Sequence, residues 1–415
     1  MSKKAWLIII VAALGYFVDI YDLILFGIIK KESLFALGYD EVTYKPYEIS
    51  LFNFQMGGMV IGGIIWGILG DKRGRVMVLF GSILMYSIAN ILNAFVTDIN
   101  TYKVLRLLAG IGLAGELGAG VTMVSETIEK GKRGLGTMLI VTFGALGGVF
   151  ATMVGNTGGF VNNIFHTSLQ NWQIAYIIGG VMGLGLLVLR TSNLESSMFE
   201  KIKEEKSVSK GNFWLILSTT KLRNLYISCI AIGIPIWFIV GVLIQLGDRF
   251  ALKNSGIQIE VPICIMWTYI GLSSGDIVSG ILSQLLKNRK TVIYIYLSFA
   301  FFASCVFMFT TDQKPSFYYT MSYILGFSTG YWALFVINSA EQFGTNLRAT
   351  TSSTVPNFVR GTVVPITLIF GHFTAQPEAK MIQIAFFLCF ICFLLAVFGT
   401  SMIEDGFDKE LDFIH

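Results

Sequence analysis

Charged residues are scarce in this chain of 415 residues. They make up 13% of it, 30 basic and 26 acidic, whereas apolar types make up 54%; a soluble domain carries roughly 25% charged residues. So few charges cannot coat a soluble protein of this length, and lipid is therefore the expected solvent. This composition excludes a soluble enzyme. The net charge of +4 is spread over short loops, so it forms no basic stripe for nucleic acid.

Metal-binding and disulfide patterns are also lacking. The five cysteines all lie within apolar runs, and their odd number argues against a disulfide framework. The three histidines are scattered, and no His/Cys spacing is typical of a metal site. No phosphate-binding loop or nucleophile motif is present. We therefore expect no metal, no cofactor and no enzymatic activity.

Long apolar runs are what the sequence has instead. About 20 apolar residues are needed to span a bilayer. No run shows the alternating pattern of a barrel strand, so each is predicted to be a helix. The predicted fold is an all-α membrane protein with twelve transmembrane helices near residues 5–29, 48–70, 76–97, 102–125, 135–160, 172–190, 222–246, 261–286, 291–311, 316–340, 350–372 and 380–403.

Lysine and arginine are distributed unevenly between the predicted loops. If the N-terminus lies inside, the inner segments hold 20 of these 30 residues and the outer segments hold eight. Because cytoplasmic loops carry the excess of positive charge, both termini are predicted to be cytoplasmic. We expect an integral multi-pass protein of the plasma membrane, specifically a bacterial inner membrane.

The chain contains an internal repeat. Glu126 and Arg133 follow the fourth apolar run with the same spacing as Glu341 and Arg348 follow the tenth, at an offset of 215 residues. Two parallel repeats of six helices are typical of transporters that rock about a site between their halves. We predict an N-terminal half (1–190), a cytoplasmic linker (191–221), a C-terminal half (222–403) and a cytoplasmic tail (404–415).

Three motifs resemble those of the major facilitator superfamily. Residues 67–75, Gly-Ile-Leu-Gly-Asp-Lys-Arg-Gly-Arg, resemble its signature loop. Residues 106–116 resemble the fourth helix of its sugar-porter and metabolite:proton symporter branches, and residues 357–360, Asn-Phe-Val-Arg, resemble the eleventh helix of the metabolite symporters. The paired glutamines of sugar porters and the Gly-Pro motif of drug antiporters are missing. The resemblance implies two pseudo-symmetric six-helix halves and transport by alternating access.

Four charged residues within the predicted helices are candidates for proton coupling: Asp19, Asp22, Arg106 and Glu116. Asp19 and Asp22 share one helix face, and an aspartate at mid-bilayer costs roughly 2.5–3.5 kcal/mol, so we expect both to face a cavity or a cation. A carboxylate balanced between desolvation and a nearby arginine can load and release a proton. The resemblance implies that Arg106 lies opposite Asp22. The alternatives are a permanent ion pair and, for Glu116, a packing role.

A second group is expected to bind substrate. Arg360 lies between Pro356 and Pro365, which loosen the eleventh helix, and its guanidinium can grip a carboxylate with two hydrogen bonds. The alternative is that Arg360 neutralises Asp276. The other candidates are Asn357, Tyr331, Trp332, Gln245 and Asp276.

Charges at the predicted inner face are candidates for gating. We expect them to form a network that locks the outward-open state and breaks when the halves rock. The alternative is a set of solvated loop charges. The candidates are Asp71, Arg73, Arg75, Glu126, Arg133, Glu341 and Arg348.

The first hypothesis is a secondary active transporter that imports a small polar metabolite, an organic acid or a zwitterion, together with protons. Its expected partners are the substrate, protons and the lipid bilayer, without nucleic acid, and the expected functional unit is a monomer. One alternative is a proton-linked sugar or polyol transporter, or an exporter. A membrane sensor without transport activity is a further alternative, against which the buried charges argue.

Overall fold

The computed structural model describes residues 3–73, 75–118, 133–165, 168–193, 213–344, 347–374 and 380–407. Within these residues the secondary structure is helical and includes no strand. Nine helices of the described part are long and apolar enough to cross a membrane. The prediction of an all-helical membrane protein is confirmed, and the count of twelve spanning helices stays a prediction.

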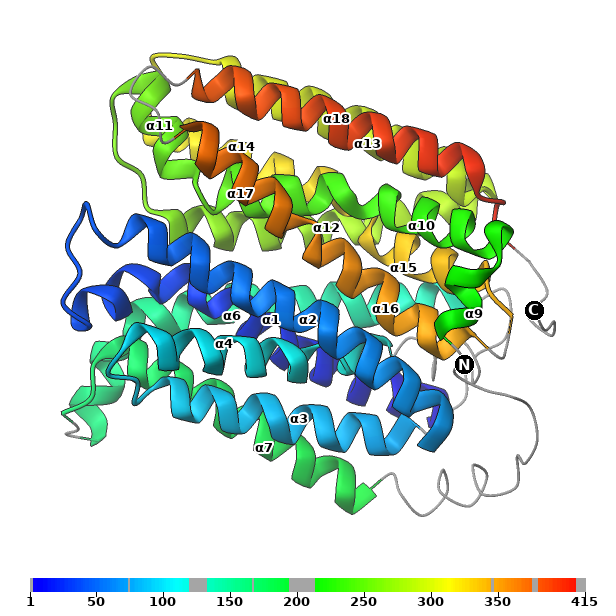
Figure 1. The fold of residues 1–415 in the computed structure, drawn as a ribbon, viewed down its shortest axis with the longest axis horizontal. Coiled ribbons are helices and arrows are strands. Elements are labelled where there is room, and N and C mark those ends of the chain that lie inside the picture. Colours follow the sequence, from blue (N-terminus) through cyan, green and yellow to red (C-terminus); the bar gives the residue numbers. More distant parts are fainter. Residues whose placement is uncertain are drawn as a thin grey trace.

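Helices from the first half of the chain pack together in the lower part of Figure 1. Helix α1 packs against α6, α2 against α4, and α3 against both α4 and α7. At Gly58 and Gly110, between α2 and α4, the opposite backbone leaves no room for a methyl group, so only glycine permits this approach. The helices are α1 (Lys3–Ala36), α2 (Lys45–Arg73), α3 (Arg75–Asn93), α4 (Ile99–Leu113), α6 (Arg133–Phe165) and α7 (Asn171–Asn193).

Helices from the second half of the chain lie above them in Figure 1. Helix α10 packs against α18, α12 against α14, and α13 against α18. The elements are α9 (Phe213–Ser218), α10 (Thr220–Phe238), the π-helix η2 (Ile239–Ile244), α11 (Gly247–Ser255), α12 (Val261–Leu286), α13 (Arg289–Phe309), α14 (Pro315–Ser328), α15 (Trp332–Glu341), α16 (Arg348–Gly361), α17 (Val363–Thr374) and α18 (Met381–Met402).

Two apolar runs in the second half of the chain that the sequence predicts as single helices are interrupted. The run near 350–372 divides into α16 and α17 at Thr362, because the ring of Pro365 conflicts with the carbonyl of Gly361. The run near 316–340 divides into α14 and α15. Here Gly330 packs directly against the backbone of Gly275 on α12, and the first backbone N–H groups of α15 are left to other partners.

The two groups of helices meet along two seams, α2 against α16 and α6 against α12. Helix α1 begins and α18 ends at the same end of the molecule (Figure 1), as the predicted cytoplasmic location of both termini requires. We call this end the inner end and the opposite one the outer end. Which side of the membrane each faces stays a prediction, as does the division of the chain into 1–190, 191–221, 222–403 and 404–415.

Candidate functional site

Arg360, on α16, is the centre of a buried polar group between the two sets of helices. Only 2% of its surface is exposed. Its Nη1 donates to Asn357 Oδ1 at 3.1 Å and its Nη2 to the Tyr16 hydroxyl at 3.3 Å. The guanidinium carbon lies 5.5 Å from the centroid of the Trp332 ring, within range of a cation–π contact. Among the described residues, no carboxylate forms an ion pair with Arg360.

Tyr16 connects this group across the interface. It comes from α1, whereas Trp332 begins α15 and Arg360 lies on α16. Its hydroxyl oxygen accepts from Trp332 Nε1 at 3.0 Å as well as from Arg360. Tyr16 was not among the predicted site residues. The one available signal was its position three residues before Asp19, on the same face of the helix.

Asn357 holds Arg360 in place rather than facing an open space. Its Nδ2 donates to Ala114 O at 2.8 Å and to Ser353 O at 2.7 Å, which leaves Oδ1 to accept from Arg360. The bond to Ala114 ties α16 to the segment that follows α4. The amide therefore fixes the orientation of the guanidinium.

Asp276 is fully buried on α12, close to this group but with a different partner. Its Oδ1 accepts the backbone N–H of Ala333 at 3.0 Å, in the first turn of α15. A helix N-terminus carries unpaired N–H groups and a partial positive charge, both of which favour a carboxylate. Asp276 and Arg360 form no ion pair in the described structure.

The residues predicted for proton coupling are all buried, on α1 and at α4. Neither oxygen of Asp22 has a hydrogen-bond partner, although Arg106 and Asn90 lie close enough to interact with it electrostatically. Arg106 donates to the side chain of Gln55 and stacks 4.8 Å from the Phe26 ring centroid. Glu116 and Asp19 are 2% and 5% exposed. Gln55, the hydrogen-bond partner of Arg106, was not predicted.

Two of the predicted substrate-binding residues lie apart from Arg360. Tyr331 is buried, and its hydroxyl donates to the carbonyl of Ile232 at 2.9 Å, a contact that fits a packing role. Gln245 lies at the outer end, directly after η2, where its carbonyl accepts from Lys30 at 2.9 Å.

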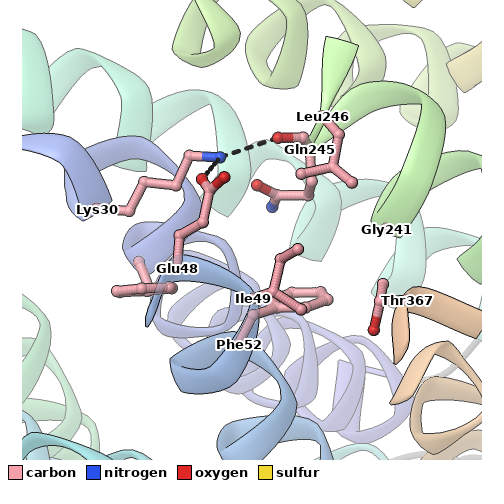
Figure 2. A pocket seen from close by; sticks show the side chains of 9 residues that line it. Lys30, Glu48, Ile49, Phe52, Gly241, Gln245, Leu246 and Thr367 are labelled. Atoms are coloured by element: carbon pink, nitrogen blue, oxygen red, sulfur yellow. Dashed lines mark hydrogen bonds and ion pairs between the residues drawn. The ribbon is translucent and has the colours of Figure 1, made fainter. Parts of the chain in front are cut away.

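Gln245 lines a small pocket between the two groups of helices (Figure 2). Its cavity measures about 20 Å³, room for one water molecule. Lys30 and Glu48 form an ion pair at its rim, with Nζ 2.6 Å from Oε2. The lining residues are Phe26, Lys30, Glu48, Ile49, Phe52, Gly241, Gln245, Leu246 and Thr367.

The gating candidates are only partly visible. Glu126 lies outside the described residues, and the side chains of Asp71, Arg75 and Arg133 do too. Arg73 is exposed at the end of α2, and Arg348 is buried at the start of α16. Glu341 forms a buried ion pair with Arg289, at the start of α13. Arg289 was not among the predicted gating residues.

Comparison with known proteins identifies the class. The family profile described as Major Facilitator Superfamily matches residues 7–366, so the chain belongs to this superfamily of transporters. The resemblance found in the three motifs is thereby confirmed. The chain is an integral membrane protein, and its relatives point to transport rather than to catalysis.

Three relatives show which branch it resembles. The niacin/nicotinamide transporter candidate of Bacillus subtilis is 27% identical over 406 residues, covering 95% of this chain and 96% of the relative. The 4-hydroxybenzoate transporter of Pseudomonas putida is 31% identical over 201 residues, 48% of this chain and 42% of the relative. The benzoate transport protein of Acinetobacter baylyi is 28% identical over 190 residues, 44% and 38% respectively. These bacterial sources agree with the expected inner-membrane location.

Proposed function

We propose that the protein is a secondary active transporter that takes up a small aromatic carboxylic acid together with protons. In this proposal twelve helices form two six-helix halves, with both termini in the cytoplasm, and the halves rock about the group around Arg360. The observation that carries the proposal is the burial of Arg360 between the two sets of helices without an ion-pair partner among the described residues. A buried cation without a counter-ion is costly, so the site favours an anion.

The surroundings of Arg360 match the two parts of an aromatic acid. Its guanidinium can hold a carboxylate through two parallel hydrogen bonds. Trp332, beneath the guanidinium, and Tyr16 provide aromatic surface beside that position. The names of the three relatives include niacin, 4-hydroxybenzoate and benzoate, each of which joins an aromatic ring to a carboxylate, and one of them also includes the uncharged nicotinamide.

Proton coupling is assigned to Asp22 and Arg106, with Asp19 on the same helix as Asp22 and Glu116 in the segment that follows α4. Asp22 is buried without a hydrogen bond to either oxygen, and Arg106 is close enough to stabilise its ionised form. Protonation of Asp22 would release that attraction and leave Arg106 bound to Gln55. This loss of attraction supports a coupling between protonation of Asp22 and the conformational change.

The test is binding of benzoate and nicotinate to the purified protein by calorimetry, with benzamide and nicotinamide as uncharged analogues. Arg360→Lys is expected to weaken binding of the acids roughly tenfold or more, because a charge-assisted bidentate contact is lost while the charge remains. The amides should bind the parent protein weakly and should be insensitive to the substitution. Arg223→Lys, at an exposed arginine, is the matched control.

A second variant separates binding from charge balance. If Arg360 only neutralises Asp276, Arg360→Ala should express poorly, and the double variant Arg360→Ala with Asp276→Ala should recover expression and transport. Such a recovery would contradict the binding role and remove the reason to prefer an acid over a neutral substrate.

A further inference from the structure

The hydroxyl of Tyr16 occupies a hydrogen-bonding position on Arg360 that a carboxylate would need. Arg360 Nη2 donates to it, and Trp332 Nε1 donates to the same oxygen, so the hydroxyl acts as acceptor for two groups of the second half of the chain. Tyr16 itself is 3% exposed on α1. It is therefore a neutral acceptor that links the N-terminal helices to α15 and α16.

We propose that Tyr16 is a positioning residue that holds Arg360 while the transporter is empty and releases it when a carboxylate binds. This inference rests on the proposed function. A buried guanidinium N–H without an acceptor is costly. In the empty protein Tyr16 satisfies this N–H and lets the two sets of helices close on each other. When substrate is bound, its carboxylate takes over that contact.

The two modes of transport separate this role from a merely structural one. Net uptake requires the empty protein to close and return, whereas exchange of internal for external substrate uses the loaded protein only. Loss of the Tyr16 hydroxyl should therefore slow net uptake and spare exchange. A residue that only stabilises the fold would lower both together.

The experiment compares Tyr16→Phe with the parent in proteoliposomes, using benzoate or nicotinate as the probe. Net uptake should fall about tenfold, as expected for one hydrogen bond to a charged group. Exchange should stay within about twofold, and the acid should bind at least as tightly as to the parent. Tyr226→Phe is the matched control, because Tyr226 is a tyrosine on α10 that is only 2% exposed and whose hydroxyl makes no hydrogen bond to Arg360.

Three outcomes would overturn the inference. Net uptake equal to that of the parent would show that the hydroxyl is not needed by the empty protein. An equal loss of net uptake and exchange, or weaker binding of the acid, would assign Tyr16 to folding or to direct contact with substrate. If the parent itself neither bound nor exchanged an aromatic acid, the proposed function would fail as well, and the two failures are thus distinguishable.

An independent observation concerns the ion cluster at the outer end. Glu48, on α2, lies between two cations: Lys30 of α1 at 2.6 Å from Oε2, and Arg249 of α11 against Oε1. Lys30 also donates to the carbonyl of Gln245 at 2.9 Å (Figure 2). The side chain of Glu48 is 4% exposed. One carboxylate thus joins both sets of helices.

We infer that the ion pairs of Glu48 hold the outer end of the transporter closed. The pocket beside the cluster measures only about 20 Å³, and Gly27 and Gly241 bring α1 and η2 into direct contact with Gln245 and Val363. Opening this end requires Arg249 and Gln245 to move away from Glu48 and Lys30. Water can then solvate the separated charges, whereas removal of one partner in the closed state leaves a buried charge unpaired.

The test uses a cysteine at Thr367, which lines the pocket and is 2% exposed, in a variant whose five native cysteines are replaced. A membrane-impermeant maleimide added from outside should label this cysteine about tenfold faster in Glu48→Gln, since the loss of one strong ion contact shifts the closed–open equilibrium by that factor. Glu41→Gln is the matched control, because Glu41 pairs with Lys31 at the same end but is 63% exposed.

A second variant distinguishes opening of the outer end from misfolding of the Glu48→Gln protein. Arg249→Gln removes one cation and leaves the Lys30–Glu48 pair, so its labelling should also exceed that of the control. Labelling rates equal to those of Glu41→Gln in both variants would overturn the assignment.

Discussion

Asp22 shows how much one buried charge depends on a single neighbour. Its two oxygens have no hydrogen-bond donor, and Gly179 on α7 packs directly against Oδ1, which leaves no space for water on that side. Its charge is balanced chiefly by Arg106. Because Asp22 is a buried acid next to a buried arginine, it is the residue whose substitution tests the proposed coupling most directly.

Asp22→Asn should abolish uphill accumulation and leave exchange measurable. The amide imitates the protonated acid in shape and charge, so only the protonation step is lost. The measurement is uptake of a labelled aromatic acid into vesicles with an imposed pH gradient, in which accumulation should drop to roughly the equilibrium level. Asp98→Asn is the control, because Asp98 is an exposed acid in the loop before α4. Gradient-driven uptake equal to that of the parent would contradict the assignment.

Arg106 and Arg360 are two buried arginines with similar surroundings. Each guanidinium lies against an aromatic ring, of Phe26 and Trp332 respectively, and donates to a neutral side chain, of Gln55 and Tyr16. Neutral acceptors and ring faces stabilise a buried cation without satisfying its charge completely. Arg106 interacts in addition with Asp22, whereas Arg360 has no ion-pair partner among the described residues and is the one that we propose binds the substrate anion.

At the scale of elements, the break between α14 and α15 creates a helix N-terminus inside the membrane-spanning part of the protein. Asp276, from the neighbouring α12, accepts the N–H of Ala333 there. Interrupted helices of this kind place unpaired backbone groups beside the substrate path in secondary transporters. The π-helix η2 is a further irregularity, directly before Gln245 at the outer gate, and such segments are frequent at functional sites.

Asp276→Ala should destabilise the protein by about 1–2 kcal/mol, the usual effect of losing the acceptor at a helix N-terminus. Asp276→Asn keeps an acceptor and should cost much less, so it is the matched control. Thermal unfolding of the detergent-solubilised protein measures both. If the asparagine variant unfolded as early as the alanine variant, the negative charge rather than the hydrogen bond would be the essential property.

At the scale of the whole molecule, an ion cluster joins the two sets of helices at the end that we propose is the outer one. The Lys30–Glu48–Arg249 cluster lies at that end, and the seam between α2 and α16 runs inward from it past Gly63 and Gly67, where α2 lies directly against α16. The group around Arg360 lies between these contacts. Movement of one set of helices relative to the other would break the outer cluster and the Tyr16 contact, which are therefore the two points at which the cycle is best tested.

The sequence by itself determined the class of protein and most of its helices. Apolar runs of about 20 residues in a chain with 13% charge must be helical, because lipid offers no partner to the backbone. Charges inside such runs are rare and costly, so Arg106, Arg360, Asp22 and Asp276 could be recognised as candidates without a structure.

Only the tertiary structure decided which residues face each other. Tyr16 and Arg360 are 344 positions apart, and Lys30 and Gln245 are 215 apart, so no local pattern pairs them. The break before α15 was likewise invisible, because it depends on how closely Gly330 approaches α12. Hydropathy determines that a segment crosses the membrane. The rotation of each helix and its neighbours are set by side-chain packing between segments, which a single sequence does not display.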